Sequence, residues 1–208
     1  PMTPEAIEAL FDREGTYAFA RWGRPMAPVV FGVDEATLGV VKGALEAVAA
    51  LAGREVVETD PELGANLMIF FFSAWDELLD VPNLGELIPD LAATVARLKA
   101  ADANRYRAFR YDKAGAIQAA FVFIAMRGGL EKLPAETLAL SEAVETVLTW
   151  GPKAFAETSP LALHPDTGAA ILRPEIAAVI RAAYDPVLPD AAEDASHALR
   201  LFARIGAG

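Results

Sequence analysis

AIQAAFVFIAM-RGGLEKLP-AETLALSEAVETVLTWG, residues Ala116–Gly151, carries the strongest secondary-structure signals in the chain. Its first part, Ala116–Met126, is an apolar run rich in aromatic and β-branched residues, which is typical of a strand buried on both faces. Its last part, Ala135–Gly151, has the period of an amphipathic helix. The residues expected to face the core are Leu140, Ala143, Val144, Val147 and Trp150, and those expected on the opposite, polar side are Glu142, Glu145 and Thr149.

The segments around this strand and helix predict a mixed sheet packed with helices, which is an α/β (α+β) domain. The expected elements are strands at Val29–Val33, Glu55–Thr59 and Ala65–Ser73, helices at Asp34–Gly53 and within Ala74–Ala103, and a hairpin of Arg105–Tyr111 with Ala116–Met126. The length of 208 residues fits a single domain. In it, residues 11–151 would supply the sheet and the core helices, and residues 152–208 a helical C-terminal subdomain.

The composition excludes several functional classes. No apolar run approaches the roughly 18 residues of a transmembrane helix, and no cysteine is present to form a disulfide or a thiolate metal site. The formal net charge of −11 opposes binding to phosphate backbones and to anionic membranes. The start, PMTPEAIEALF, lacks the basic head and apolar segment of a signal peptide. On this feature alone we expect a cytoplasmic protein, unless a leader has been removed.

Arg105–Tyr111 is a local exception to the acidic composition. Its arginines Arg105, Arg107 and Arg110 alternate with aromatic residues, a pattern that can bind single-stranded nucleic acid. The same pattern also suits an edge strand, because charged side chains protect an open edge from mispairing. We favour the edge strand and expect no nucleic-acid partner.

Several segments, in their order along the chain, resemble a bacterial family of zincin-like proteins of unknown function. These segments are RWGRP at Arg21–Pro25, GANLMIFFF at Gly64–Phe72, the strand before the acidic helix, and LRPEIAAVIRAAYDPVLP at Leu172–Pro189. The resemblance covers roughly residues 11–195. It implies a zincin-like fold, and because most members are exported, it implies a periplasmic or secreted protein.

The zinc-binding motif of zincins is missing at the matching positions. Zincins carry HExxH on the helix that follows the sheet, where two histidines bind zinc and the glutamate polarises water. In this chain the corresponding residues are Ser141, Glu142 and Glu145, of which only Glu142 keeps the residue type. His164 and His197 are the only histidines. We therefore expect no bound zinc and no other cofactor.

These observations predict a pseudo-metalloprotease domain that binds another protein or a cell-envelope component. The preferred contact residues are Tyr17, Arg21, Trp22 and Arg24, since Trp, Tyr and Arg are enriched in binding hot spots; alternatively, Trp22 fills the bottom of the core. A second hypothesis is a hydrolase that uses Glu142 and Glu145 as an acid/base pair, with His164 as a further base. The third is a nucleic-acid binder that uses Arg105–Tyr111.

Overall fold

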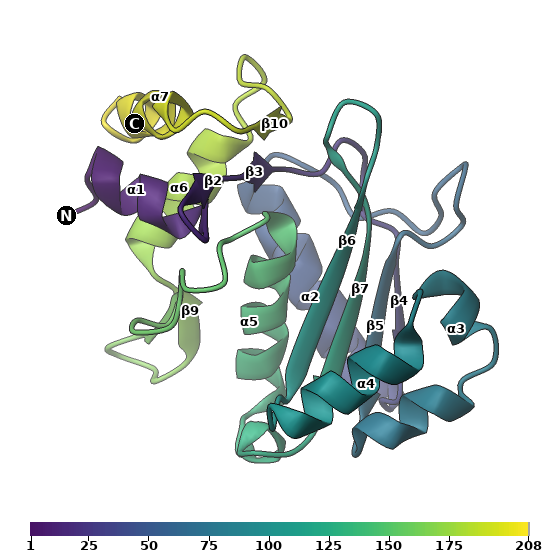
Figure 1. Ribbon diagram of the computed structural model, residues 1–208. Coiled ribbons are helices and arrows are strands. Elements are labelled where there is room, and N and C mark those ends of the chain that lie inside the picture. The colour runs from purple at the N-terminus through teal and green to yellow at the C-terminus, as the bar shows by residue number, and fades with distance from the viewer. Residues whose placement is uncertain (208) are drawn as a thin grey trace.

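The computed structural model describes residues 1–207 and has a four-stranded mixed sheet at its centre (Figure 1). The strands, in sheet order, are β4 (Pro28–Phe31), β5 (Leu67–Phe72), β7 (Ile117–Ala125) and β6 (Arg105–Tyr111). The first three are parallel, and β6 runs antiparallel to β7 at one edge. The predicted α/β fold is confirmed, including β6 as an edge strand in a hairpin with β7.

Helices cover both faces of the sheet, as Figure 1 shows. One face carries α2 (Glu35–Leu51) and α5 (Ala135–Val147), which pack against each other. The other face carries the 3₁₀ helix η1 (Trp75–Asp80), α3 (Leu84–Leu87) and α4 (Leu91–Ala100). The apolar run of β7 contributes to both cores: Val122 and Ile124 to the first, Phe121 and Phe123 to the second. Burial on both faces explains why this strand is apolar throughout.

The two ends of the chain pack together beside the sheet (Figure 1). The N-terminal elements are α1 (Pro4–Leu10), β1 (Asp12–Arg13), β2 (Thr16–Tyr17) and β3 (Phe19–Ala20), and the C-terminal elements are β8 (Leu161–Leu163), β9 (Ala170–Leu172), α6 (Pro174–Ala183), β10 (Ala191–Ala192) and α7 (Ser196–Ile205). Helix α1 packs on α7, and β3 pairs with β10. Residues 152–208 were expected to be helical; the part that is described contains the β8–β9 hairpin as well.

Two predicted elements differ from the structure. Glu55–Thr59 is not a strand of the sheet, because only Val56 forms a bridge, to Met26, before the chain turns at Asp60. The acidic helix α5 ends at Val147, not at Gly151. Leu148 forms a bridge with Arg21, and Thr149 donates its amide hydrogen to the Ala20 carbonyl (3.2 Å), so pairing with the N-terminal segment ends the helix.

A short 3₁₀ turn, η2 (Leu130–Lys132), lies in the connection between β7 and α5. Within residues 1–207, no helix combines the length and the apolar composition needed to span a bilayer.

Candidate functional site: a groove beside strand β6

Arg21 binds the C-terminal end of helix α6 from inside the protein. Its guanidinium donates hydrogen bonds to the carbonyls of Ala183 (2.9 Å), Asp185 (2.7 Å) and Leu188 (2.8 Å), and its Nε donates to the Asp190 carboxylate (2.8 Å). The last carbonyls of a helix have no partner within the helix. Buried Arg21 supplies donors for this region, so its position is explained by folding.

Three aromatic side chains donate hydrogen bonds to the last carbonyls of helix α5. Trp22 Nε1 donates to the Thr146 carbonyl (2.9 Å), Trp150 Nε1 to Val144 (2.8 Å) and Tyr184 Oη to Val147 (2.5 Å). Trp22 is 1% exposed. Two of the segments that carry the zincin resemblance, RWGRP and the AAYDPVLP end of Leu172–Pro189, thus meet at the ends of α5 and α6.

Tyr17, the third residue of the expected contact surface, is buried too. A hydrogen bond of 2.7 Å joins its Oη to His197 Nδ1 on α7. The prediction that Tyr17, Arg21 and Trp22 form a binding surface is therefore wrong: all three lie in the interior, and for Trp22 the core alternative is correct.

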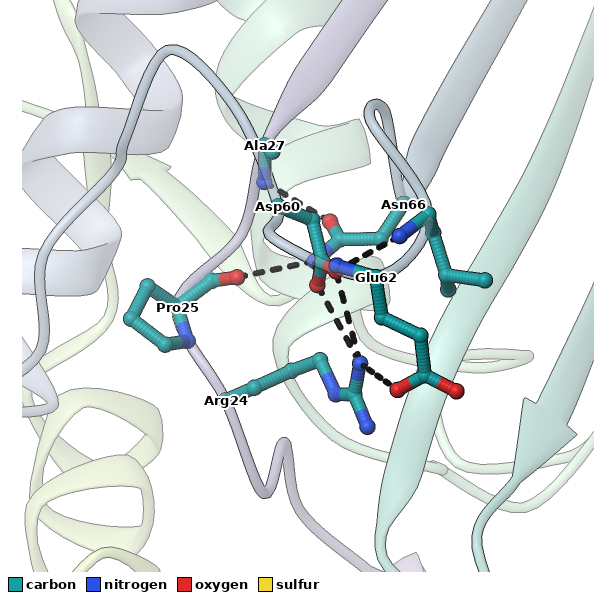
Figure 2. Close-up of polar contacts among 7 residues, drawn as sticks. Arg24, Pro25, Ala27, Asp60, Glu62 and Asn66 are labelled. Carbon is teal, nitrogen blue, oxygen red and sulfur yellow. Dashed lines mark hydrogen bonds and ion pairs between the residues drawn. The ribbon is translucent and has the colours of Figure 1, made fainter.

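Arg24 is the one residue of the expected contact surface that does not lie in the interior, and Figure 2 shows its surroundings. Its Nη1 lies 3.3 Å from Asp60 Oδ2 and 3.1 Å from Glu62 Oε2. Asp60 also accepts hydrogen bonds from the amides of Glu62 and Leu63 and from the Asn66 side chain, and Asn66 in turn binds Pro25 and Ala27. Burial raises the pKa of Asp60, but these hydrogen bonds outweigh it and lower the pKa to about 2. The cluster fixes the turn before β5.

Glu142 is buried, although we expected it on a solvated helix face. Its side chain is 4% exposed, with Oε1 3.0 Å from Arg105 Nε and Oε2 2.6 Å from Arg107 Nη2. The reason is that β6 covers this side of α5 and places both arginines against it. Each carboxylate oxygen of Glu142 therefore contacts the guanidinium group of a different arginine.

Glu145 lies one turn further along α5 and is more exposed, at 20%. Its Oε2 is 3.6 Å from Arg105 Nη1 and 3.8 Å from Arg107 Nη2, and Ser141 Oγ donates a long hydrogen bond to it (3.4 Å). Burial raises the pKa of Glu145, with Arg107 acting in the opposite direction. Of the two predicted carboxylates, Glu145 is the one that lines a groove.

His164 stabilises a turn. It lies between β8 and β9, and its Nδ1 accepts the amide hydrogen of Asp166 (3.1 Å). His164 is not among the groove-lining residues, whereas Glu145 is. The structure thus brings Glu142 and Glu145 together with arginines and gives no hydrogen bond from His164 to either carboxylate.

A groove in two parts runs along β6. One part, of about 570 Å³, lies between β6 and the segment 150–156, and a second part, of about 480 Å³, continues toward the β8–β9 hairpin. Glu145, Phe155 and Ala156 line both parts. The first part is also lined by Arg13, Arg107, Phe109, Tyr111 and Trp150.

The outer edge of β6 carries unpaired backbone groups beside this groove. Ala125 N donates to Asn104 O (2.9 Å), so the hydrogen-bonded pairs with β7 involve Asn104 and every second residue after it. The amides and carbonyls of Arg105, Arg107 and Phe109 therefore point away from β7. Among them, only the Phe109 carbonyl has a partner in the described structure, a 3.3 Å hydrogen bond from the Arg110 side chain.

The arginines of β6 are divided between the two faces of the sheet. Arg105 and Arg107 face α5, whereas Arg110 lies over the Phe121 ring (5.5 Å) and donates to the Leu87 carbonyl (3.2 Å). They do not form one basic surface.

Within residues 1–207, no three carboxylate or imidazole side chains are close enough to share a metal ion. Comparisons with protein-family models, with curated proteins and with solved structures give no match to this chain. The zincin resemblance therefore stays a prediction.

Sequence reasoning did not identify the groove, although one signal pointed to it. Arg105 and Arg107 are two residues apart, so their side chains lie on the same face of the strand. Glu142 and Glu145 are three residues apart, so their side chains lie on the same face of the helix. A positively charged strand face and a negatively charged helix face indicate that β6 lies against α5. Arg13 and Phe155 give no such signal, because the fold alone brings them to the groove.

Proposed function

We propose that this protein is a non-catalytic binding domain that takes up an extended polypeptide segment in the groove beside β6. The observation that carries the proposal is the open edge of β6, whose outward backbone groups lie next to this groove. Strand addition to an exposed sheet edge is a general mode of peptide recognition, in which main-chain hydrogen bonds give affinity and side-chain pockets give specificity.

The dimensions and lining suit such a segment. Strand β6 has seven residues, from Arg105 to Tyr111. A peptide in the extended conformation has the same rise of about 3.3 Å per residue, so a segment of about six residues fits along the strand. Phe109, Trp150 and Phe155 provide apolar surface for its side chains. On the zincin resemblance, the domain would be a pseudo-metalloprotease that kept its fold and binds without cleaving.

The carboxylates of the site support binding over hydrolysis. An acid/base pair needs one carboxyl protonated and the other free to accept a proton. Glu142 contacts both Arg105 and Arg107 and is shielded from solvent, so it is placed to hold β6 against α5. The hydrolase hypothesis depends on Glu145 alone.

The test is selection of peptides from a random display library on the immobilised protein, followed by affinity measurements with two variants. Phe109→Ala removes the side chain and keeps the outward amide hydrogen. Phe109→Pro removes both, and leaves the β7 ladder intact because this amide does not point to β7. We expect Phe109→Pro to bind about 5–10-fold more weakly than Phe109→Ala, as expected for one lost hydrogen bond.

Equal affinity of the two variants would contradict strand addition. Hydrolysis is checked by mass spectrometry of the selected peptides after incubation: cleavage by the wild type that disappears in Glu145→Gln would replace the binding proposal with the hydrolase.

A further inference from the structure

Arg13 is held at the mouth of the groove without an acidic partner. Its Nη2 donates a hydrogen bond to the Trp150 carbonyl (3.2 Å), and no carboxylate of residues 1–207 lies within ion-pair distance of it. Its backbone is fixed as well, because Gly151 approaches β1 so closely that an added Cβ would lie 2.1 Å from the Asp12 carbonyl oxygen. Arg13 is thus an exposed cation that lines the groove, is held by a backbone carbonyl and has no carboxylate partner among the described residues.

Arg107 faces the same part of the groove. Its side chain is 18% exposed, and its buried Nε has no hydrogen-bond partner in the described structure. The charged residues that line this part of the groove are two arginines, Arg13 and Arg107, and one glutamate, Glu145, so its lining carries a net positive charge. Guanidinium groups pair with carboxylates through two parallel hydrogen bonds.

The walls between the two arginines are aromatic. Trp150 and Phe155 meet edge to face with ring centroids 5.1 Å apart, and Phe109 and Tyr111 line the β6 side. A ligand that reaches Arg13 therefore contacts apolar surface and a cation together.

We infer that the Arg13 end of the groove is a carboxylate-binding subsite that recognises an apolar residue with an adjacent carboxylate in the bound polypeptide. This inference rests on the proposed function and adds the chemistry of the recognised segment. The carboxylate is either the C-terminus of the polypeptide or an acidic side chain.

Three short peptides separate these sources: acetyl-Ala-Phe with a free carboxylate, the same peptide as its C-terminal amide, and acetyl-Glu-Phe amide. Binding is followed by amide chemical shifts of ¹⁵N-labelled protein. We expect at least one carboxylate-bearing peptide to bind about 5–10-fold more tightly than acetyl-Ala-Phe amide and to shift the signals of Gly151, Phe155 and Tyr111. A preference for the free C-terminus assigns the terminal carboxylate, and a preference for the Glu peptide assigns the side chain.

The matched variants are Arg13→Gln and Arg97→Gln. Arg97 is an exposed arginine on α4, across the sheet from the groove. Arg13→Gln should remove the carboxylate preference, and Arg97→Gln should leave it unchanged.

Two results would overturn the inference. If the amide and the carboxylate peptides shift the groove signals with equal affinity, the subsite is not a carboxylate site, while peptide binding in the groove stands. If none of the three peptides shifts them, the subsite inference fails, and the display selection decides the proposed function separately.

Discussion

His197 is the residue whose burial has the clearest consequence for stability. It is 3% exposed, and its Nε2 has no hydrogen-bond partner in the described structure. The centroids of its ring and of the Phe19 ring are 4.3 Å apart. Burial lowers its pKa from 6.5 to about 4, and nearby Arg200 contributes in the same direction. The folded protein therefore keeps the imidazole neutral at pH values where the unfolded chain protonates it.

We predict that this histidine makes the protein less stable in acid. Its contribution is fully present above about pH 6.5 and is lost as the pH falls toward 4, by about 3 kcal/mol in total. Urea unfolding of the wild type and of Tyr17→Phe/His197→Phe between pH 4 and 7 tests this, because the double variant removes both hydrogen-bonding partners together. The wild type should lose unfolding free energy relative to the double variant as the pH falls from about 6.5 toward 4. If the unfolding free energies of the two proteins change with pH in parallel, the lowered pKa of His197 is contradicted.

Glu142 gives the second prediction at this scale. Glu142→Gln keeps the shape of the side chain and leaves Arg105 and Arg107 without their shared negative charge. Loss of one partner from a buried ion pair costs about 3–5 kcal/mol, and the partial exposure of both arginines reduces this to about 2 kcal/mol. Glu157→Gln, at an exposed loop position, is the control. A loss below about 0.5 kcal/mol for Glu142→Gln would show that the pair does not hold β6 to α5.

At the scale of elements, the contact between β1 and the chain after α5 shapes the groove. Gly151→Ala would place Cβ 2.1 Å from the Asp12 carbonyl, so β1 or the groove wall must move. We predict a loss of about 1–3 kcal/mol together with weaker peptide binding. Gly43→Ala is the matched control: Gly43 lies on an exposed face of α2 with open space around it, and alanine should stabilise that helix slightly. Unchanged stability and binding in Gly151→Ala would contradict this view of the wall.

The elements differ in how far the sequence predicts them. The strand and hairpin at β6 and β7 follow from local patterns, since apolar runs and turn residues are read over a few positions. The end of α5 does not, because Leu148 and Thr149 pair with residues far away in the chain. Arg21 and Trp22 could not be placed from the sequence for the same reason. Their residue types are typical of a binding surface, but in the fold they donate hydrogen bonds to buried carbonyls that are far away in the chain.

For the whole molecule, the central claim is that the outer edge of β6 is open in the free protein and becomes paired in the complex. The α/β architecture and the place of β6 at one edge of the sheet could be predicted from the order and patterns of elements in the sequence. The groove does not, because it forms where β1, residues 150–156 and β6 meet, and only the closed fold brings these segments together.

Amide hydrogen exchange along β6, measured by NMR with and without a selected peptide, tests this claim most directly. In the free protein, the amides of Tyr106 and Ala108 should be protected by β7, and those of Arg105, Arg107 and Phe109 should exchange rapidly. We predict that the peptide slows exchange at Arg107 and Phe109 and leaves Tyr106 and Ala108 unchanged. Rapid exchange at Arg107 and Phe109 in the saturated complex, or strong protection of both before any peptide is added, would contradict the account.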